Sequence, residues 1–461
     1  TDNLLLEIKK SLKKRQWGAA VRLEIDQDVD ERLVSVLKKA LELVPHDIYY
    51  ISGPIDLTFL FKLYNKIKLP QLKYEQHIPE IPPVFLDETS YFHIIAKEDI
   101  LLHHPYDAFT PVVDFISQAA KDPQVLAIKQ TLYRISGNSP IIAALSEAAE
   151  GGKQVTVLIE VKARFDEENN IQWATRLEQA GCHVIYGLVG LKTHAKMTLV
   201  VRREESGIKR YLHLGTGNYN DVTATLYTDI GLFTANEQLG SDASAVFNTL
   251  SGYSDLPKLQ KLSLAPVGLR DTLIALIERE IVHAKKGKKA RIIAKMNALS
   301  DIEIIRHLYR ASQAGVKIQL IVRGICCLKP NIQKVSHNIS VVSIVGKFLE
   351  HSRIFYFSND TQEEVYLSSA DWMARNLNRR VELFFPILQA SLKDRIKKVL
   401  AVLLKDREKA RRLTPSGRYL RYKHKTKVLY NSQDVLSAAI LSDLPLEPSV
   451  QNIFKPRHSE E

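Results

Sequence analysis

Two segments of the sequence each present a histidine and a cation two residues apart. His194 and Lys196 precede the apolar run 197–201, and His351 and Arg353 precede the apolar run 354–357. Both runs have the length and composition of buried strands. Because successive side chains of a strand alternate between its faces, each histidine is expected to share a face with its cation.

A turn of small residues that contains an asparagine follows each histidine. The asparagine lies 24 residues after the first histidine and 25 residues after the second. An acidic residue comes next in both segments. The asparagines are Asn218 and Asn376, and the acids are Asp229 and Glu382.

Residues of these types can transfer a phosphoryl group. A neutral imidazole can attack phosphorus and hold the group covalently, and a second imidazole can exchange a proton with it. Cations neutralise the charge on the phosphoryl oxygens, and a carboxylate can fix a histidine tautomer. One His-x-Lys alone is a weak signal, but two matched copies predict a two-histidine site. Asp229 and Glu382 are both candidates for the carboxylate that orients His194.

The elements around these segments repeat as well. Residues 141–161 align with residues 304–324, and each segment has the pattern of a helix, a glycine stop and a buried strand. From Tyr91 onward, apolar runs of strand length alternate with helical patterns, which favours a largely parallel sheet. The expected fold class is α/β, with two tandem similar α/β domains preceded by a mixed α+β domain.

Changes in composition mark the expected domain boundaries. A proline-rich linker closes the mixed domain, and the stretch 251–266 separates the two α/β domains. Since residue 1 is Thr and not Met, we expect an N-terminal part to precede this sequence. The expected domains are 1–85, 86–262 with His194, 263–447 with His351, and a C-terminal tail at 448–461.

The composition narrows the class of partner. With 64 Lys and Arg against 52 Asp and Glu, the formal net charge is +12, which favours a polyanion: nucleic acid, an anionic membrane or a phosphate-rich substrate. The 3 cysteines cannot form a disulfide framework, which fits a reducing cytosol. No apolar run approaches the roughly 20 residues of a membrane-spanning helix.

Three further features have competing interpretations. The pair His103-His104 resembles a metal pair, but a structural role is favoured because no carboxylate partner is evident nearby. The basic run 285–289 could contact a polyanion and the basic segment 405–427 could contact nucleic acid, but a solvated helix face is the favoured interpretation of both.

The motifs together resemble a known family. His-x-Lys followed by an asparagine turn, present twice, resembles the phospholipase D superfamily, and longer runs are similar to bacterial polyphosphate kinases of the histidine-phosphorylating type. The second copy reads His-x-Arg, which departs from the superfamily and suits phosphate binding, because arginine binds phosphate in a bidentate manner. The matching runs are 127–134, 162–169, 186–196, 213–220 and 366–373.

The resemblance implies roles for individual residues. His194 corresponds to the phosphorylated histidine, and His351 to a second active-site histidine that contacts the nucleotide. Tyr227 corresponds to a tyrosine that stacks on the base, and Arg323 to an arginine on the ATP phosphates. The supporting residues for phosphate binding or orientation are Lys196, Asn218, Asp229, Arg353, Asn376 and Glu382.

Arg134 and Arg164 correspond to two arginines that the family associates with magnesium. A guanidinium has only donors and cannot ligate a cation. We therefore expect both arginines to clamp the phosphates that magnesium bridges.

The resemblance also implies an activity. It is the reversible transfer of the γ-phosphate of ATP to inorganic polyphosphate through a phosphohistidine, with Mg²⁺ as cofactor. The implied partners are ATP or ADP and polyphosphate, in a cytoplasmic homo-oligomer with peripheral membrane contact and no dedicated nucleic-acid partner. The rival interpretation is a phospholipase D-type phosphodiesterase acting on lipid or nucleic-acid diesters. Family members carry a further helical domain that supplies an asparagine to the adenine pocket, and nothing in this sequence matches it.

Overall fold

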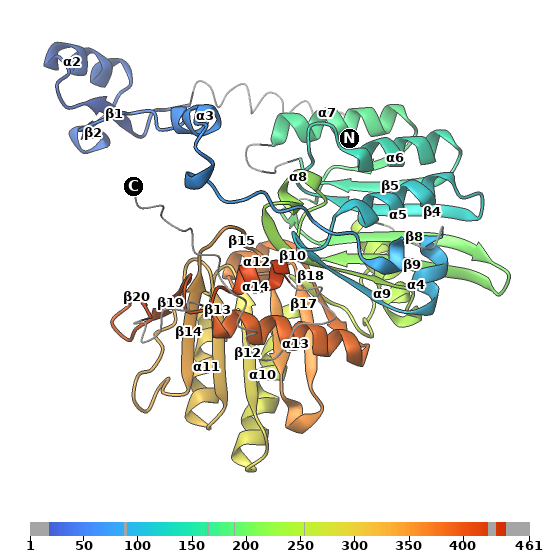
Figure 1. Ribbon diagram of the computed structural model, residues 1–461. Helices are drawn as coiled ribbons and strands as arrows, with labels where there is room; N and C mark the ends of the chain where they lie inside the picture. The colour runs from blue at the N-terminus through green and yellow to red at the C-terminus, as the bar shows by residue number, and fades with distance from the viewer. Residues whose placement is uncertain are drawn as a thin grey trace, which may run out of the picture. The chain divides into compact units, whose positions relative to one another are not determined.

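The structure is a computed structural model of the chain (Figure 1). It separates into two compact units, Thr1–Gln76 and His77–Glu461. The residues that it describes are 18–86, 90–161, 163, 166–188, 190–252, 254–422 and 430–438. The expected tail at 448–461 lies outside the described residues.

The first unit is small and mixes helices with strands, as expected. Its parallel strands pair Leu23 with Ile48, and Asp30 caps the first helix by accepting a hydrogen bond from the backbone N–H of Arg32 at 2.9 Å. Its elements are β1 (Leu23–Asp26), α2 (Glu31–Ala40), η1 (Pro45–Asp47), β2 (Ile48–Ile51), α3 (Phe59–Lys66) and η2 (Pro70–Leu72).

The second unit contains two sheets. The strand order in the first sheet is β15-β10-β9-β8-β4-β5-β6, and β3 also pairs with β10. The strands of this half of the unit, of which β7 belongs to the second sheet, are β3 (Ile100–His104), β4 (Val125–Leu132), β5 (Gln154–Ile159), β6 (His183–Ile185), β7 (Lys192–Thr193), β8 (Lys196–Glu204), β9 (Gly207–Gly215) and β10 (Tyr227–Thr234). The helices are η3 (Pro83–Phe85), α4 (Tyr91–Lys97), α5 (Thr110–Lys121), α6 (Pro140–Glu150), α7 (Glu167–Gln179), α8 (Asp221–Ala224) and α9 (Glu237–Leu250).

The strand order in the second sheet is β11-β18-β17-β16-β12-β13-β14-β19-β20, and β7 also pairs with β18. The strands of the second half, of which β15 belongs to the first sheet, are β11 (Ser263–Ala265), β12 (Arg291–Met296), β13 (Lys317–Val322), β14 (Ile339–Ile344), β15 (Leu349–Glu350), β16 (Ile354–Phe357), β17 (Glu364–Ser368), β18 (Arg380–Ile387), β19 (Ala410–Leu413) and β20 (Tyr419–Arg421). The helices are α10 (Leu269–Lys285), α11 (Ile302–Gln313), η4 (Asn359–Thr361), α12 (Ala374–Arg379), α13 (Ala390–Lys405) and α14 (Ser432–Ala438).

The two sheets share one topology. The order β10-β9-β8-β4-β5-β6 in the first sheet matches β18-β17-β16-β12-β13-β14 in the second. The repeated segments coincide with α6-β5 and α11-β13, and Gly152 and Gly315 occupy the same place after each helix with φ of 84° and 99°. Such left-handed residues commonly end helices. The predicted α/β fold with two similar halves is confirmed.

The expectation of largely parallel sheets is wrong. Within the two sheets of the described residues, the parallel pairings are β4-β5-β6, β12-β13-β14 and the two-residue pairings of β15 with β10 and of β7 with β18. The long strands β8 and β9 pair antiparallel. Two residues, 205 and 206, connect β8 to β9. A connection that short permits only an antiparallel hairpin. The sequence pattern showed apolar strands but did not distinguish a hairpin from a crossover.

Short strands are exchanged between the two halves. β7, just before His194, pairs in parallel with β18 of the second half. β15, just before His351, pairs in parallel with β10 of the first half. The backbone N–H groups of His194 and Ala195 both donate to the carbonyl of Val381 at 2.9 Å. Each histidine is therefore positioned by the other half of the molecule.

The halves also share one apolar core. A single cluster of buried side chains contains Met197 and Leu214 from the first sheet and Ile354 and Leu367 from the second. In Figure 1 the labels β15, β10 and β18 lie at the junction between the cyan-to-green first half and the yellow-to-orange second half. The exchanged strands and this core join the halves into one unit.

The structure also shows what the two basic segments form and whether a helix could span a membrane. The basic segment after α13 is a β19–β20 hairpin as far as Arg421, not a helix, and residues 423–427 lie outside the described part. In the run 285–289, Lys288 forms an exposed ion pair with Asp360 at 2.6 Å. No helix among the described residues combines the length and apolarity needed to cross a bilayer.

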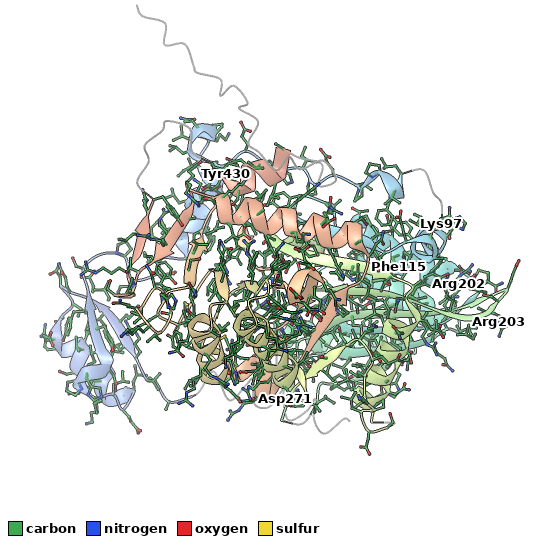
Figure 2. The ribbon with its side chains drawn as sticks, turned by 90° about the horizontal axis from the view of Figure 1, so that it is seen from below. Lys97, Phe115, Arg202, Arg203, Asp271 and Tyr430 are labelled. Carbon is green, nitrogen blue, oxygen red and sulfur yellow. The ribbon has the colours of Figure 1, made fainter. Side chains whose placement is uncertain are left out.

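A buried carboxylate secures the connection between the halves, which gives a stability prediction. Asp242 is 3% exposed and accepts the backbone N–H groups of Gln260, Lys261 and Leu262 at 2.6–3.0 Å. Asp242→Ala leaves these donors without an acceptor, so the free energy of unfolding measured in urea should fall by about 2 kcal/mol or more. The control Asp271→Ala, at an exposed position (Figure 2), should change it by less than about 1 kcal/mol. Equal effects would contradict the assignment.

Candidate active site

His194 lies buried at the start of β8, with 7% of its surface exposed. Its Nδ1 is 2.9 Å from Oε2 of Glu382, a residue of β18. The Tyr133 ring packs edge-on against it, with 4.8 Å between ring centroids. The structure therefore selects Glu382 over Asp229 as the partner of His194, an alternative that the sequence left open.

Glu382 is completely buried and held by further donors. Ser369 Oγ donates to its Oε2 at 2.5 Å, and Asn376 Nδ2 donates to its Oε1 at 2.7 Å. Burial raises the pKa of Glu382, an effect opposed by the charge of Lys196. Because a carboxylate only accepts hydrogen bonds, Nδ1 of His194 is the donor and Nε2 carries the lone pair.

The surroundings of His194 keep its ring neutral. Burial lowers the pKa of His194 well below its usual value, and the nearby charges of Lys196, Arg380, Arg353 and His351 lower it further. Lys196 is itself 1% exposed, its Nζ donates to the carbonyl of His194, and burial strongly lowers its pKa. A neutral imidazole with a free Nε2 has the form required of a nucleophile.

The second histidine has the mirror-image arrangement. Nδ1 of His351 lies 2.8 Å from Oδ2 of Asp229, a residue of β10 in the first half. Although burial opposes ionisation, the charges of His351 and Arg353 hold the pKa of Asp229 at about 2. Burial lowers the pKa of His351 despite this carboxylate. Each histidine is thus paired with the acid of the other half.

The two acids are held by matching hydrogen bonds. Thr216 Oγ1 donates to Asp229 at 2.7 Å and accepts from the N–H of Ile230 at 3.0 Å. In the second half, Ser369 Oγ donates to Glu382 at 2.5 Å and accepts from the N–H of Leu383 at 2.9 Å. Thr216 and Ser369 are therefore equivalent residues of the repeat.

The equivalence of Thr216 and Ser369 identifies the residue of the second half that corresponds to Asn218. Two positions after Thr216 comes Asn218, whereas two positions after Ser369 comes Asp371. Asn376 lies on α12 and hydrogen-bonds Glu382, so the similar spacings of Asn218 and Asn376 from their histidines do not reflect equivalence. Gly217, which precedes Asn218, must be a glycine, because a Cβ at this position would lie 2.2 Å from Asp229 Oδ2.

Arg353 links the two halves of the site. It forms a bidentate ion pair with Asp371 at 3.1–3.2 Å, and its Nη1 donates to the carbonyl of Thr216 at 3.2 Å. The same nitrogen lies 3.3 Å from Nε2 of His351. Its charge also lowers the pKa of His194, so this guanidinium acts electrostatically on both histidines.

Other predicted residues gather beside His351. The Tyr227 ring lies 5.4 Å from the His351 ring. Arg323 follows β13, and its Nε donates to Asn297 Oδ1 at 3.0 Å; Asn297 in turn donates to the carbonyl of His351 at 3.1 Å. Tyr227 and Arg323 therefore lie at the second histidine, the side of the site for which a nucleotide role was predicted.

The predicted arginine pair is only partly described. Arg134 follows Tyr133, the ring that packs on His194, and its Nε lies 3.0 Å from Asp166 Oδ2. Arg164 lies outside the described residues. Among the described residues, no group of three or more His, Cys, Asp or Glu side chains is arranged to hold a metal ion. His103 and His104 are buried on β3, in keeping with a structural role.

Sequence reasoning missed several members of the site. Arg380 Nη1 lies 3.8 Å from Glu382 Oε1, and its charge acts on His194. Its place two residues before Glu382 on a strand was the available signal, since such residues share a face. Lys295 was also missed: it is 2% exposed and pairs with Glu350 at 3.0 Å, just before His351.

Together these features define a class of protein: a duplicated α/β unit with one polar site, in which two histidines are oriented by crossed carboxylates and surrounded by buried cations. Comparison with known proteins gives the family. Residues 90–256 match the family model of polyphosphate kinase C-terminal domain 1, residues 262–433 match C-terminal domain 2, and residues 1–63 match the middle domain.

Individual relatives agree with these matches. The chain is 58% identical over 420 residues to a polyphosphate kinase of Halalkalibacterium halodurans, covering 90% of the chain and 60% of that protein. It is 49% identical to one of Synechocystis, covering 98% of the chain and 65% of that protein. The crystal structure of polyphosphate kinase from Porphyromonas gingivalis superposes with a TM-score of 0.84 at 35% identity, covering 90% of the chain and 64% of that structure.

The chain belongs to the polyphosphate kinase family. It spans about 60% of the length of several curated relatives that it matches.

The electrostatics of His194 give a direct prediction. In ¹⁵N-histidine-labelled protein, the His194 ring should stay neutral from about pH 8 to about pH 6, because burial and neighbouring cations lower its pKa well below 6.5. In the urea-unfolded chain the same ring should titrate near about 6.5. A titration midpoint at or above the unfolded value in the folded protein would contradict the site described above.

Proposed function

We propose that this chain performs the polyphosphate kinase reaction: the reversible transfer of the ATP γ-phosphate to inorganic polyphosphate through phosphorylated His194. The observation that carries the proposal is the neutral, buried His194, whose Nδ1–H is bound by Glu382 and whose Nε2 has no hydrogen-bond partner among the described residues. Membership of the family supports the same activity.

In the first step, Nε2 of His194 attacks the γ-phosphorus of ATP. The N–P bond forms as the bond to the ADP oxygen breaks, and ADP leaves. Nδ1–H stays hydrogen-bonded to Glu382, which stabilises the positive charge that develops on the phosphorylated ring. Lys196, Arg353 and Arg380 supply positive charge for the transferring group.

In the second step, a terminal oxygen of the polyphosphate chain attacks the phosphorus of phosphohistidine 194. The N–P bond breaks and neutral imidazole is restored. His351, held by Asp229 and facing Arg353, is placed to hydrogen-bond the transferred group in both steps. The reverse sequence makes ATP.

For the nucleotide, we propose that Tyr227 stacks on the base and that Arg323 binds the phosphates, since both lie at His351. The described residues do not form a cage of carboxylates for magnesium. We therefore propose that the ion belongs to the substrate as its ATP complex, with Arg134 and Arg164 binding the phosphates that it bridges. Asn376 positions Glu382, and Asn218 belongs to the turn beside Asp229.

The rival activity, a phospholipase D-type phosphodiesterase, is less well supported. Its second motif would read His-x-Lys, whereas this chain has Arg353 in a bidentate ion pair. The matching relatives are polyphosphate kinases.

We further propose the boundaries 86–262 and 263–447 for the two repeats, supported by family models that end at 256 and begin at 262. We also propose that the protein is a homo-oligomer in the cytoplasm, with peripheral membrane contact and no dedicated nucleic-acid partner. The free thiol of exposed Cys327 is compatible with a reducing compartment.

The covalent intermediate can be tested by labelling. Incubation of the protein with γ-labelled ATP should give an acid-labile, base-stable label that His194→Ala abolishes. His46→Ala, at an exposed histidine whose side chain is 85% accessible, should keep it. Label retained by His194→Ala would overturn the assignment of the nucleophile. Transfer to polyphosphate at the wild-type rate by His351→Ala would refute the role of the second histidine.

The nucleotide role of Tyr227 needs a separate test. Tyr227→Leu removes the ring and should raise the KM for ATP about 10-fold, since base stacking contributes roughly 1–3 kcal/mol. Tyr227→Phe keeps the ring and should stay within about 2-fold of wild type. If the two variants have the same KM, the tyrosine does not act by stacking.

A further inference from the structure

A second cavity lies at the other end of the second sheet from the histidines. Its volume is about 420 Å³, within the range of small-molecule sites. It is formed by the first residues of β13 and β14, the loop before β14, and the end of β19. Its polar lining includes Lys317, Gln319, His337, Asn338, Arg412 and Thr414.

The cavity has a partly apolar lining, and the ionisable side chains among its described lining residues are all basic. Lys317, His337 and Arg412 are all exposed. In the part of the chain that the structure describes, their side chains have no ion pair or hydrogen bond, and no Asp or Glu lines the cavity. Lys329 and Lys334 stand exposed on the adjoining loop. Three basic side chains that line one cavity, with no counter-ion among the described residues, attract an anion.

The walls of the cavity are held in place before any ligand binds. In the loop before β14, Ser336 Oγ donates to the carbonyl of Lys329 at 2.7 Å, and Asn338 Nδ2 donates to that of Ser312 at 3.1 Å. On the opposite wall, Thr414 Oγ1 donates to the carbonyl of Arg418 at 2.9 Å. Such preorganisation reduces the entropy lost on binding.

The cavity is separate from the catalytic site. Lys317 begins β13, whereas Arg323 follows the last residue of that strand. At about 3.3 Å per residue, the five steps along β13 put roughly 17 Å between the two ends of the strand. A ligand in the cavity therefore does not contact either histidine directly, although a long chain could extend from one site toward the other.

We propose that this cavity is a second binding site for a chain of phosphates. Lysine and arginine are the side chains that bind phosphate oxygens most strongly. Among the described residues that line the cavity there is no Phe, Tyr or Trp to stack on a base, so the phosphates and not a nucleoside are the recognised group. The assignment of polyphosphate as the natural ligand of this cavity rests on the proposed function. Binding at the cavity does not require His194.

The test uses tripolyphosphate as the probe and the ring signals of ¹⁵N-histidine-labelled protein as the local readout. In the His194→Ala background, tripolyphosphate should shift the His337 signal in a saturable manner. Lys317→Glu combined with Arg412→Glu should weaken that binding at least about 10-fold. The matched control reverses two exposed charges on the first half, Lys121→Glu and Arg203→Glu, and should bind as the parent does; Arg203 is labelled in Figure 2.

The outcomes separate this proposal from the proposed function. A His337 signal that tripolyphosphate does not move, or equal binding by the two charge-reversed proteins, would overturn the second site. If ATP binds there at least about 10-fold more tightly than tripolyphosphate, the site is one for nucleotides and the phosphate-chain assignment is wrong. Failure of His194 labelling with retained tripolyphosphate binding would refute the proposed function and leave the second site standing.

Discussion

The hydrogen bond between Nδ1 of His194 and Glu382 is the constraint on which the rest of the site depends. It fixes which nitrogen of the ring carries the proton, and so leaves the other free for reaction. Its two partners lie 188 residues apart, and they meet because β7 pairs with β18 across the repeat. The exchange of short strands is therefore the feature of the fold that assembles the site.

The electrostatics of the site follow from this arrangement. The buried cations Lys196, Arg353 and Lys295 lie among the carboxylates Glu382, Asp229, Asp371 and Glu350, and burial lowers the pKa of both histidines. Arg353 binds Asp371 in a bidentate manner, contacts the His351 ring and lowers the pKa of His194 through its charge. An anionic group between the histidines would meet oriented positive charge without reorganising the protein, the condition for electrostatic stabilisation of a transferring phosphate.

The sequence predicted the composition of the site better than its connectivity. Histidine, cation and acid recur at matching spacings, so the duplicated α/β fold and the pairing of each histidine with some carboxylate could be inferred. Which carboxylate pairs with which histidine could not be inferred, because β7 and β15 are two-residue strands with no periodic signal in the sequence. The same limit explains the antiparallel hairpins, the false equivalence of Asn218 with Asn376, and the omission of Arg380, which only three-dimensional contacts reveal.

The central claim is that each histidine is oriented by the acid of the other half. It is tested most directly by the downfield ¹H signals of hydrogen-bonded ring Nδ1–H groups in ¹⁵N-histidine-labelled Glu382→Gln and Asp229→Asn proteins. Glu382→Gln is expected to remove or strongly shift the His194 signal and to preserve that of His351, while Asp229→Asn should do the reverse. A His194 signal that responds to Asp229→Asn and not to Glu382→Gln would contradict the central claim.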